Sequence, residues 1–282
     1  MGRAADGFIF IRMNQQRPVG DLLREWRQRR RMSQLGLALD ADVSAKHLSF
    51  VETGRAQPSR EMVLRLAERL DVPLRERNAL LLAAGFAPLY RERPLVDPAL
   101  QGARLAIDRL LAAHEPYPAI AVDRHWNLVL ANRLIAPLMK GVAESLLAPP
   151  VNVLRLSLHP QGLAPRIVNY AQWREHLLQR LQRQVEVSGD AELSALLEEL
   201  REYPVRADAH EVSEEFAVTG VIIPLQLKVE GAVLSFFSAT TIFGSPVDVT
   251  LAELAIESFF PADQATARAL EGLAAAAVRS AS

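Results

Sequence analysis

The residues with the clearest chemical potential lie on one expected helix that begins after Ser44. At 100° per residue, turning Leu48 and Val51 toward a core leaves Lys46 and Ser49 pointing outward. A lysine can donate to guanine O6 or N7, a serine hydroxyl can donate or accept, and alanine or phenylalanine can contact a thymine methyl group. This is the chemistry of reading base edges in DNA. The residues that we expect to contact DNA from this helix are Ser44, Ala45, Lys46, Ser49 and Phe50.

Four flanking residues, Gln34, Arg55, Ser59 and Arg60, could add contacts to the DNA backbone. Gln34 opens the preceding helix, where the helix dipole favours an anion, so it could contact a phosphate or an adjacent base. Arg55, Ser59 and Arg60 follow the recognition helix and suit the flanking phosphates. Structural roles stay open as alternatives, because a serine at a helix start also serves as a cap and Phe50 could pack on another domain or subunit.

Five short helices in about 70 residues must position these groups. The first is expected over residues 21–32 and the fifth over residues 74–84. The three between them start after serines that suit an N-cap, namely Ser33, Ser44 and Ser59. Ala41-Asp42 forms the expected turn, and Gly54 ends the third helix. The second helix is expected to carry its apolar residues Leu35, Leu37, Ala38 and Leu39, and we expect Glu52 to support packing or pair with an arginine.

Charge divides the chain of 282 residues unevenly. Residues 1–95 hold 17 Lys and Arg against 11 Asp and Glu, a net +6, whereas residues 96–282 hold 15 against 22, a net −7. A basic N-terminal third suits contact with phosphates. The chain contains no cysteine, which excludes disulfides and thiol catalysis and suits a reducing cytoplasm. No apolar run approaches the length of a membrane span, and we expect no signal peptide.

The part of the chain beyond a proline-rich segment changes character. Three prolines among charges mark residues 87–103 as the expected linker between domains. Five strands are expected over residues 118–123, 128–131, 216–229, 232–243 and 254–260. The expected helices of this part cover residues 104–113, 132–139, 166–185, 191–203 and 265–277, with Asn132 opening the second of them. We therefore predict an α+β domain with a five-stranded antiparallel sheet.

A sheet covered by helices on one face leaves an apolar cleft, which is a common place for a small ligand. The candidate lining residues are Trp126, Met139, Trp173, Leu177, Phe236 and Phe237, and each could instead be plain core. Arg166 or Arg174 could pair with a carboxylate head group, since a guanidinium matches that geometry. The six histidines show no metal-ligand spacing and no nucleophile motif is present, so we predict no enzyme, no metal and no cofactor.

The pattern SQ-x-x-LA followed by VS-x-x-x-LS-x-x-E-x-G, over residues 33–54, resembles the Xre/Cro-type helix-turn-helix of phage repressors. Asp42 in the turn and Gly36 inside the second helix depart from that pattern. From Gly20 onward the chain resembles the MmyB-like group of these regulators. That resemblance implies a PAS-like C-terminal domain that binds a small hydrophobic, fatty-acid-like ligand, and PAIAVDRHWNLVLAN looks like its opening.

Together these features predict a flexible leader at 1–17, an all-α helix-turn-helix domain of five helices at 18–86, a linker at 87–103 and a PAS-like domain at 104–282. We expect a cytoplasmic regulator that binds double-stranded DNA as a homodimer, because one helix-turn-helix reads only a half-site. An alternative stays open, in which the C-terminal domain is only an oligomerisation or protein-interaction module.

Overall fold

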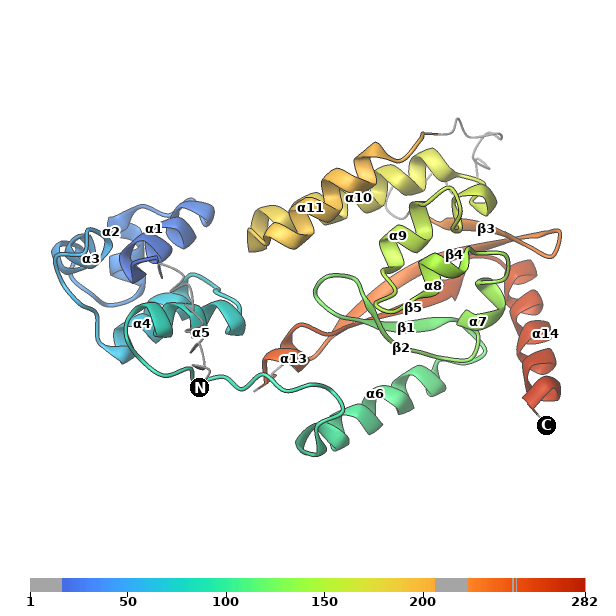
Figure 1. Ribbon diagram of the computed structural model, residues 1–282, viewed down its shortest axis with the longest axis horizontal. Coiled ribbons are helices and arrows are strands. Elements are labelled where there is room, and N and C mark those ends of the chain that lie inside the picture. The colour runs from blue at the N-terminus through green and yellow to red at the C-terminus, as the bar shows by residue number, and fades with distance from the viewer. Residues whose placement is uncertain (1–16, 206–222, 245, 247, 282) are drawn as a thin grey trace, which may run out of the picture. The chain divides into compact units, whose positions relative to one another are not determined.

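The protein is described by a computed structural model, shown in Figure 1, over residues 17–205, 223–244, 246 and 248–281. The chain divides into two compact units, with the boundary between Arg91 and Glu92. The expected leader at 1–17 falls outside the described residues except for Arg17, whose guanidinium donates to Glu25 at 2.6 Å. Each unit has a core of its own, so each is described separately.

The N-terminal unit consists of five helices, as predicted. They are α1 (Val19–Arg29), α2 (Gln34–Asp40), α3 (Ala45–Glu52), α4 (Arg60–Arg69) and α5 (Leu74–Ala83). Three of them begin at the predicted serine caps, where Ser33, Ser44 and Ser59 each accept a hydrogen bond from a backbone N–H in the first turn. Asp42 (φ 52°) supplies the left-handed turn between α2 and α3, and Gly54 (φ 70°) ends α3.

The core of this unit forms where the helices turn their apolar sides to one another. Leu37 of α2, Leu48 and Val51 of α3 and Leu66 of α4 are buried. Leu35 and Leu39, which the sequence places on the same helix, lie outside this core and are 60% and 72% exposed. The reason is the helical period: each lies two residues, about 200°, from the buried Leu37 and therefore on the opposite side of α2.

The C-terminal unit is built on a five-stranded antiparallel sheet, as predicted (Figure 1). Its strands are β1 (Ala119–Val122), β2 (Leu128–Ala131), β3 (Leu225–Val229), β4 (Ala232–Ile242) and β5 (Ala255–Pro261). They lie in the order β2-β1-β5-β4-β3, so that β5 is central and β2 and β3 are the edge strands. Residues 216–222 of the expected third strand lie outside the described residues.

Helices cover both faces of this sheet. The further elements are η1 (Pro98–Leu100), α6 (Gln101–Ala113), α7 (Ile135–Leu138), α8 (Glu144–Leu147), α9 (Val153–Leu158), η2 (Ala164–Arg166), α10 (Tyr170–Ser188), α11 (Ala191–Glu202), α13 (Val249–Ala252) and α14 (Gln264–Ala281). Successive side chains of β1 point to opposite faces of the sheet, so each face has its own core. Ala119 and Ala121 pack with α6 on one face. Ile120 and Val122 pack on the other face with the larger cluster that includes α9, α10 and α11.

Two predicted helix starts were wrong for the same physical reason. Asn132 does not open a helix; it is buried, donates to the carbonyls of Leu111 and Tyr117, and accepts from the N–H of Ala119. The helix expected from residue 166 begins instead at Tyr170, because the chain before it forms a bridge to β3. In both places, groups remote in sequence take the hydrogen bonds of these residues, so the backbone does not enter a helix there.

The segment expected as a linker makes specific contacts with the unit on either side of it. The Asn78 side chain on α5 accepts from the N–H groups of Leu89 and Tyr90 and donates to the Tyr90 carbonyl. Leu95 is buried in the core beside α6, and the Arg93 carbonyl accepts from the Thr250 hydroxyl. The stretch of chain free of such contacts is therefore shorter than residues 87–103.

Candidate DNA interface and ligand cavity

The outer side of α3 presents the residues predicted to read DNA. Lys46 is exposed, whereas Ala45, Ser49 and Phe50 are half-buried. The Lys46 ammonium lies 5.7 Å from the centre of the Phe50 ring, within the range of a cation–π contact. Ser44 is exposed, but its Oγ accepts from the His47 N–H, so this hydroxyl oxygen is already used in capping the helix.

A buried carboxylate holds α3 against the two helices before it. Glu52 is only 1% exposed, and its two oxygens accept from Nε and Nη2 of Arg27 at 2.7 and 2.8 Å. Burial alone would raise the pKa of Glu52, but the hydrogen bonds from Arg27 and Gln34 outweigh it and lower that pKa below its ordinary value. The prediction that Glu52 serves packing and pairs with an arginine thus agrees with the geometry.

Gln34 takes part in this network, because its amide Nε2 donates to Glu52 at 2.8 Å. The contact orients the Gln34 side chain at the N-terminus of α2. The Arg24 guanidinium adds a hydrogen bond to the Glu52 backbone carbonyl at 3.0 Å. The end of α3 is also packed tightly on α1, since a Cβ added to Gly20 would lie 2.2 Å from the Val51 carbonyl oxygen. The position of the recognition helix is therefore fixed by side-chain and backbone contacts together.

The cations predicted to flank the recognition helix are available to a ligand. Arg55, in the loop after α3, and Arg60, at the first position of α4, are both exposed. Neither forms an ion pair within the described part of the chain, and the same holds for Lys46. Ser59 is exposed too, although its Oγ accepts from the Met62 N–H as a helix cap. Lys46 on α3, Arg55 in the loop after it and Arg60 at the start of α4 thus form no ion pair with any carboxylate among the described residues.

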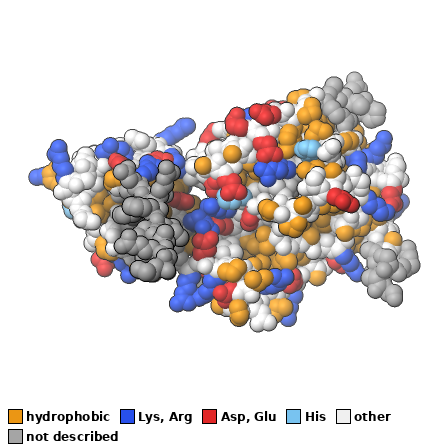
Figure 2. All heavy atoms as spheres, viewed as in Figure 1, with side chains coloured by type: hydrophobic (Ala, Val, Ile, Leu, Met, Phe, Trp, Pro, Cys, Tyr) orange, Lys and Arg blue, Asp and Glu red, His pale blue; other side chains and the backbone are white. Residues whose placement is uncertain are grey.

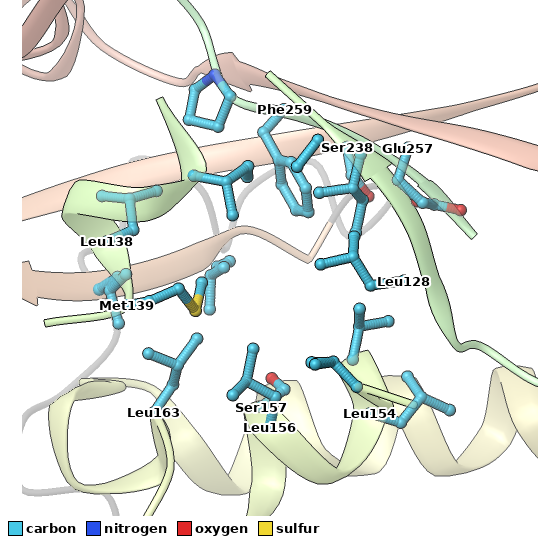
Figure 3. Close-up of a pocket in the computed structure, with 18 of the residues that line it drawn as sticks. Leu128, Leu138, Met139, Leu154, Leu156, Ser157, Leu163, Ser238, Glu257 and Phe259 are labelled. Atoms are coloured by element: carbon cyan, nitrogen blue, oxygen red, sulfur yellow. The ribbon is translucent and has the colours of Figure 1, made fainter. Parts of the chain in front are cut away.

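The C-terminal unit encloses a cavity of about 720 Å³ between the sheet and the helices that cover it. Figure 2 shows apolar side chains gathered on the visible face of this unit, and Figure 3 shows the cavity itself. The sheet contributes Ile120, Leu128, Leu227, Phe236 and Phe259, and the helical side contributes Leu138, Leu154, Leu156 and Leu177. The volume suits a molecule of drug or lipid size, and the lining is mainly aliphatic and aromatic.

The structure brings five of the predicted ligand residues to this cavity and leaves three elsewhere. Those that line it are Trp126, Met139, Trp173, Leu177 and Phe236. Phe237 points away from it and stacks on Phe260, with ring centres 5.1 Å apart. Arg166 donates to the carbonyls of Leu138, Lys140 and Lys228, and Arg174 donates to those of Leu200 and Arg201. The guanidinium groups of both arginines thus donate to backbone carbonyls, and sequence patterns could not show these contacts.

Sequence reasoning missed the polar group at one end of the cavity. Arg180 of α10 binds Glu257 of β5 through both carboxylate oxygens, at 2.5 and 3.3 Å. The Thr240 hydroxyl donates to Glu257 and accepts from Arg180, each at 2.8 Å. The Arg180 guanidinium also lies 4.5 Å from the Trp126 ring centre. The sequence did contain a signal for this ion pair, namely the single acidic residue in the apolar strand AIESFFP. A charge on a buried central strand needs a partner of opposite charge.

The turn that carries Trp126 is held rigidly. Trp126 has φ 67°, which is uncommon for a bulky residue, and the Asp123 carboxylate fixes the turn by accepting from the N–H groups of His125 and Asn127. The indole Nε1 donates to Gln184 of α10 at 2.8 Å. The cavity wall at this point is therefore tied to the same helix that carries Arg180.

Two other features are absent from the described residues. No group of three or more His, Cys, Asp or Glu side chains there is arranged to hold a metal ion. No helix there is both long enough and apolar enough to pass through a lipid bilayer.

Comparison with known families agrees with both parts of this geometry. Residues 18–80 match a family described as a helix-turn-helix domain, and residues 103–273 match the family described as "MmyB-like transcription regulator ligand binding domain". No curated protein matches the chain. The first match covers helices α1 to α4 and most of α5, and the second covers the sheet and nearly all of the helices that line the cavity. The chain therefore belongs to the family of MmyB-like transcription regulators, with a helix-turn-helix domain preceding the ligand-binding domain.

Proposed function

We propose that this protein is a cytoplasmic, homodimeric regulator of the Xre type that binds specific DNA sequences and senses a small hydrophobic, fatty-acid-like ligand. The observation that carries the proposal is the apolar cavity of about 720 Å³ in the same chain as an outward-facing, cationic recognition helix. The extended alkyl body of such a ligand matches the aliphatic walls. A dimer supplies two recognition helices, which is what a two-fold symmetric operator requires.

In this proposal α3 enters the major groove, and its exposed residues read the bases. Lys46 donates to a guanine, Ser49 contacts a neighbouring base edge, and Ala45 or Phe50 packs on a thymine methyl group. Gln34, Ser44, Arg55, Ser59 and Arg60 contact the flanking phosphates or sugars and fix the register. A ligand in the C-terminal domain changes DNA affinity only if it binds the two dimer geometries with different affinity.

Replacement of Lys46 by alanine tests the assignment of the recognition helix. We expect Lys46→Ala to lower affinity for the selected operator by about tenfold or more and to relax the preference at one base pair per half-site. The operator is first obtained from a random-oligonucleotide selection with the purified chain, and affinities then come from a filter-binding titration. Lys228→Ala, which removes an exposed lysine from β3, is the matched control and should change neither quantity. Unchanged affinity and selectivity for Lys46→Ala would refute this assignment.

A second function for the C-terminal domain is oligomerisation without any ligand. In this second function, the buried aromatic side chains are ordinary core residues and do not form the wall of a ligand site. Native mass spectrometry of the purified chain, with and without an added single-chain amphiphile, separates the two. The sensor proposal predicts a dimer that carries one amphiphile per subunit, whereas a dimer that stays unliganded at saturating amphiphile would favour the module.

A further inference from the structure

The two units are joined by a short stretch of chain that is clamped on both sides. On the N-terminal side, the Asn78 side chain of α5 accepts from the N–H groups of Leu89 and Tyr90, each at 3.0 Å, and donates to the Tyr90 carbonyl at 2.6 Å. The Arg77 guanidinium also lies 6.0 Å from the centre of the Tyr90 ring. The chain up to Tyr90 is therefore fixed to the last helix of the helix-turn-helix domain.

On the C-terminal side, the clamp is α13, the short helix before β5. The Thr250 hydroxyl donates to the Arg93 carbonyl at 2.6 Å. The buried Asp248 carboxylate caps α13 and holds Thr250 in place by accepting from its N–H at 2.9 Å. Two residues after Arg93, the Leu95 side chain is buried in the core beside α6. The chain from Arg93 onward is therefore fixed to the ligand-binding domain.

Between the two clamps lie Arg91 and Glu92, which are both exposed and which we call the connector. The three peptide units from Tyr90 to Arg93 span at most about 11 Å. Pro94 fixes its own φ and restricts Arg93 before it to extended conformations, which stiffens the connection further. A connector this short cannot absorb a movement of α13 as a long flexible linker would.

The clamp on the C-terminal side is in contact with the strand that lines the cavity. Ile256 of β5 packs in the same core as Leu95, on the face of the sheet that α6 covers. The next residue of the strand, Glu257, and Phe259 line the cavity on the opposite face. Protein interiors are close-packed and transmit small displacements, so a ligand that shifts β5 also shifts Leu95 and α13.

We propose that the clamped connector transmits occupancy of the cavity to the helix-turn-helix domain, through β5, α13 and the chain from Leu95 back to Tyr90. This inference rests on the proposed function, since it says how a ligand in the cavity reaches the DNA-binding domain. The ligand acts by favouring one of two arrangements of β5 and α13, and the connector carries that preference onward. Loosening the connector should leave each binding event intact and remove the coupling between them.

The test lengthens the connector in the full-length protein. Gly-Ser-Gly-Ser inserted between Arg91 and Glu92 adds flexible chain at a place that does not line the cavity. Operator affinity is measured by filter binding with and without saturating decanoate, and decanoate affinity is measured by calorimetry. We expect decanoate to change operator affinity about fivefold or more in wild type and less than about twofold in the insertion variant. The affinity for decanoate itself should differ less than about threefold between the two proteins.

A point replacement tests the clamp without changing the length of the chain. Thr250→Val removes the hydroxyl that holds the Arg93 carbonyl while keeping the side-chain shape, and it should lower the response to decanoate to about twofold or less. Thr241→Val, at an exposed position of β4, is the matched control. The control for added length carries the same insertion between Glu230 and Gly231, in the exposed turn between β3 and β4. Both controls should keep the wild-type response.

The outcomes separate this inference from the proposed function. A wild-type response in the folded insertion variant, or in folded Thr250→Val, would overturn the inference and leave the proposed function intact. Equal loss of the response in the insertion variant and in the control for added length would also overturn it, because the loss would then not depend on the connector. Operator affinity of wild type that does not change with decanoate would contradict the proposed function and this inference together.

Discussion

Glu52→Ala should destabilise the N-terminal domain by about 3 kcal/mol or more, because it leaves a buried arginine without its carboxylate. Glu52 is 1% exposed and receives hydrogen bonds from Arg27 and Gln34, which lie on two other helices. Its loss removes the side-chain hydrogen bonds by which Arg27 of α1 and Gln34 of α2 hold the recognition helix. Urea unfolding of the full-length protein measures the change, followed by the fluorescence of Trp26 in the core of this domain. The two other tryptophans, Trp126 and Trp173, are replaced by phenylalanine in wild type and variant alike, so that the signal comes from Trp26. Glu68→Ala, at an exposed position on α4, is the control and should stay within about 0.5 kcal/mol.

The same residue predicts a dependence of stability on pH. The pKa of Glu52 is lowered in the folded state, so its contribution is complete above the ordinary glutamate value of 4.5 and is lost as the pH falls through the lower folded value. The difference in stability between wild type and Glu52→Gln should therefore be largest near neutral pH and shrink below pH 4.5. A difference that stayed constant across this range, or an alanine variant as stable as wild type, would contradict the role assigned to Glu52.

Affinity for the selected operator should fall about 150-fold between 50 and 200 mM salt, because much of the binding comes from phosphate contacts. One charged residue, Lys46, lies among the expected base contacts, so the flanking arginines must supply much of the affinity. Arg55 and Arg60 in each subunit give a proposed dimer about four phosphate contacts that release counterions. The plot of log affinity against log salt should then have a slope of about −3.6.

Single replacements measure how much each flanking arginine contributes to the slope of log affinity against log salt. Arg55→Ala or Arg60→Ala removes one phosphate contact from each half-site and should make the slope shallower by about 1.8, with little change in sequence preference. Arg109→Ala, an exposed arginine on α6 in the C-terminal unit, is the control and should leave the slope unchanged. If the arginine variants kept the wild-type slope, the phosphate contacts would have to be assigned to other residues.

Local signals in the sequence predicted the N-terminal domain well. A serine before an apolar run marks a helix start because its hydroxyl satisfies a backbone N–H only a few residues away, and Ser33, Ser44 and Ser59 all do this. Gly54 and Asp42 likewise take the left-handed conformation expected at a helix end and at a tight turn. These features depend on neighbours along the chain, which the sequence displays directly.

Features that depend on remote partners were not predictable in this way. The Asn132 amide is used by Leu111, Tyr117 and Ala119, which lie on other elements. Large apolar residues such as Trp173 of α10 and Phe236 of β4 line the cavity, because a helix and a sheet bury their apolar sides against each other. The partners of arginines could not be inferred, since backbone carbonyls occupy Arg166 and Arg174, while Arg180 reaches a carboxylate 77 residues away.

The central claim is that occupancy of the cavity changes how tightly the protein binds its operator. The most direct test is the operator affinity of the full-length protein with and without saturating decanoate, with calorimetry confirming that the ligand is bound. Leu128→Trp, which extends a larger side chain from the cavity wall into the space, is the control that should abolish the response. We predict a change in affinity of about fivefold or more in wild type. Equal affinity with the cavity empty and occupied would contradict the claim.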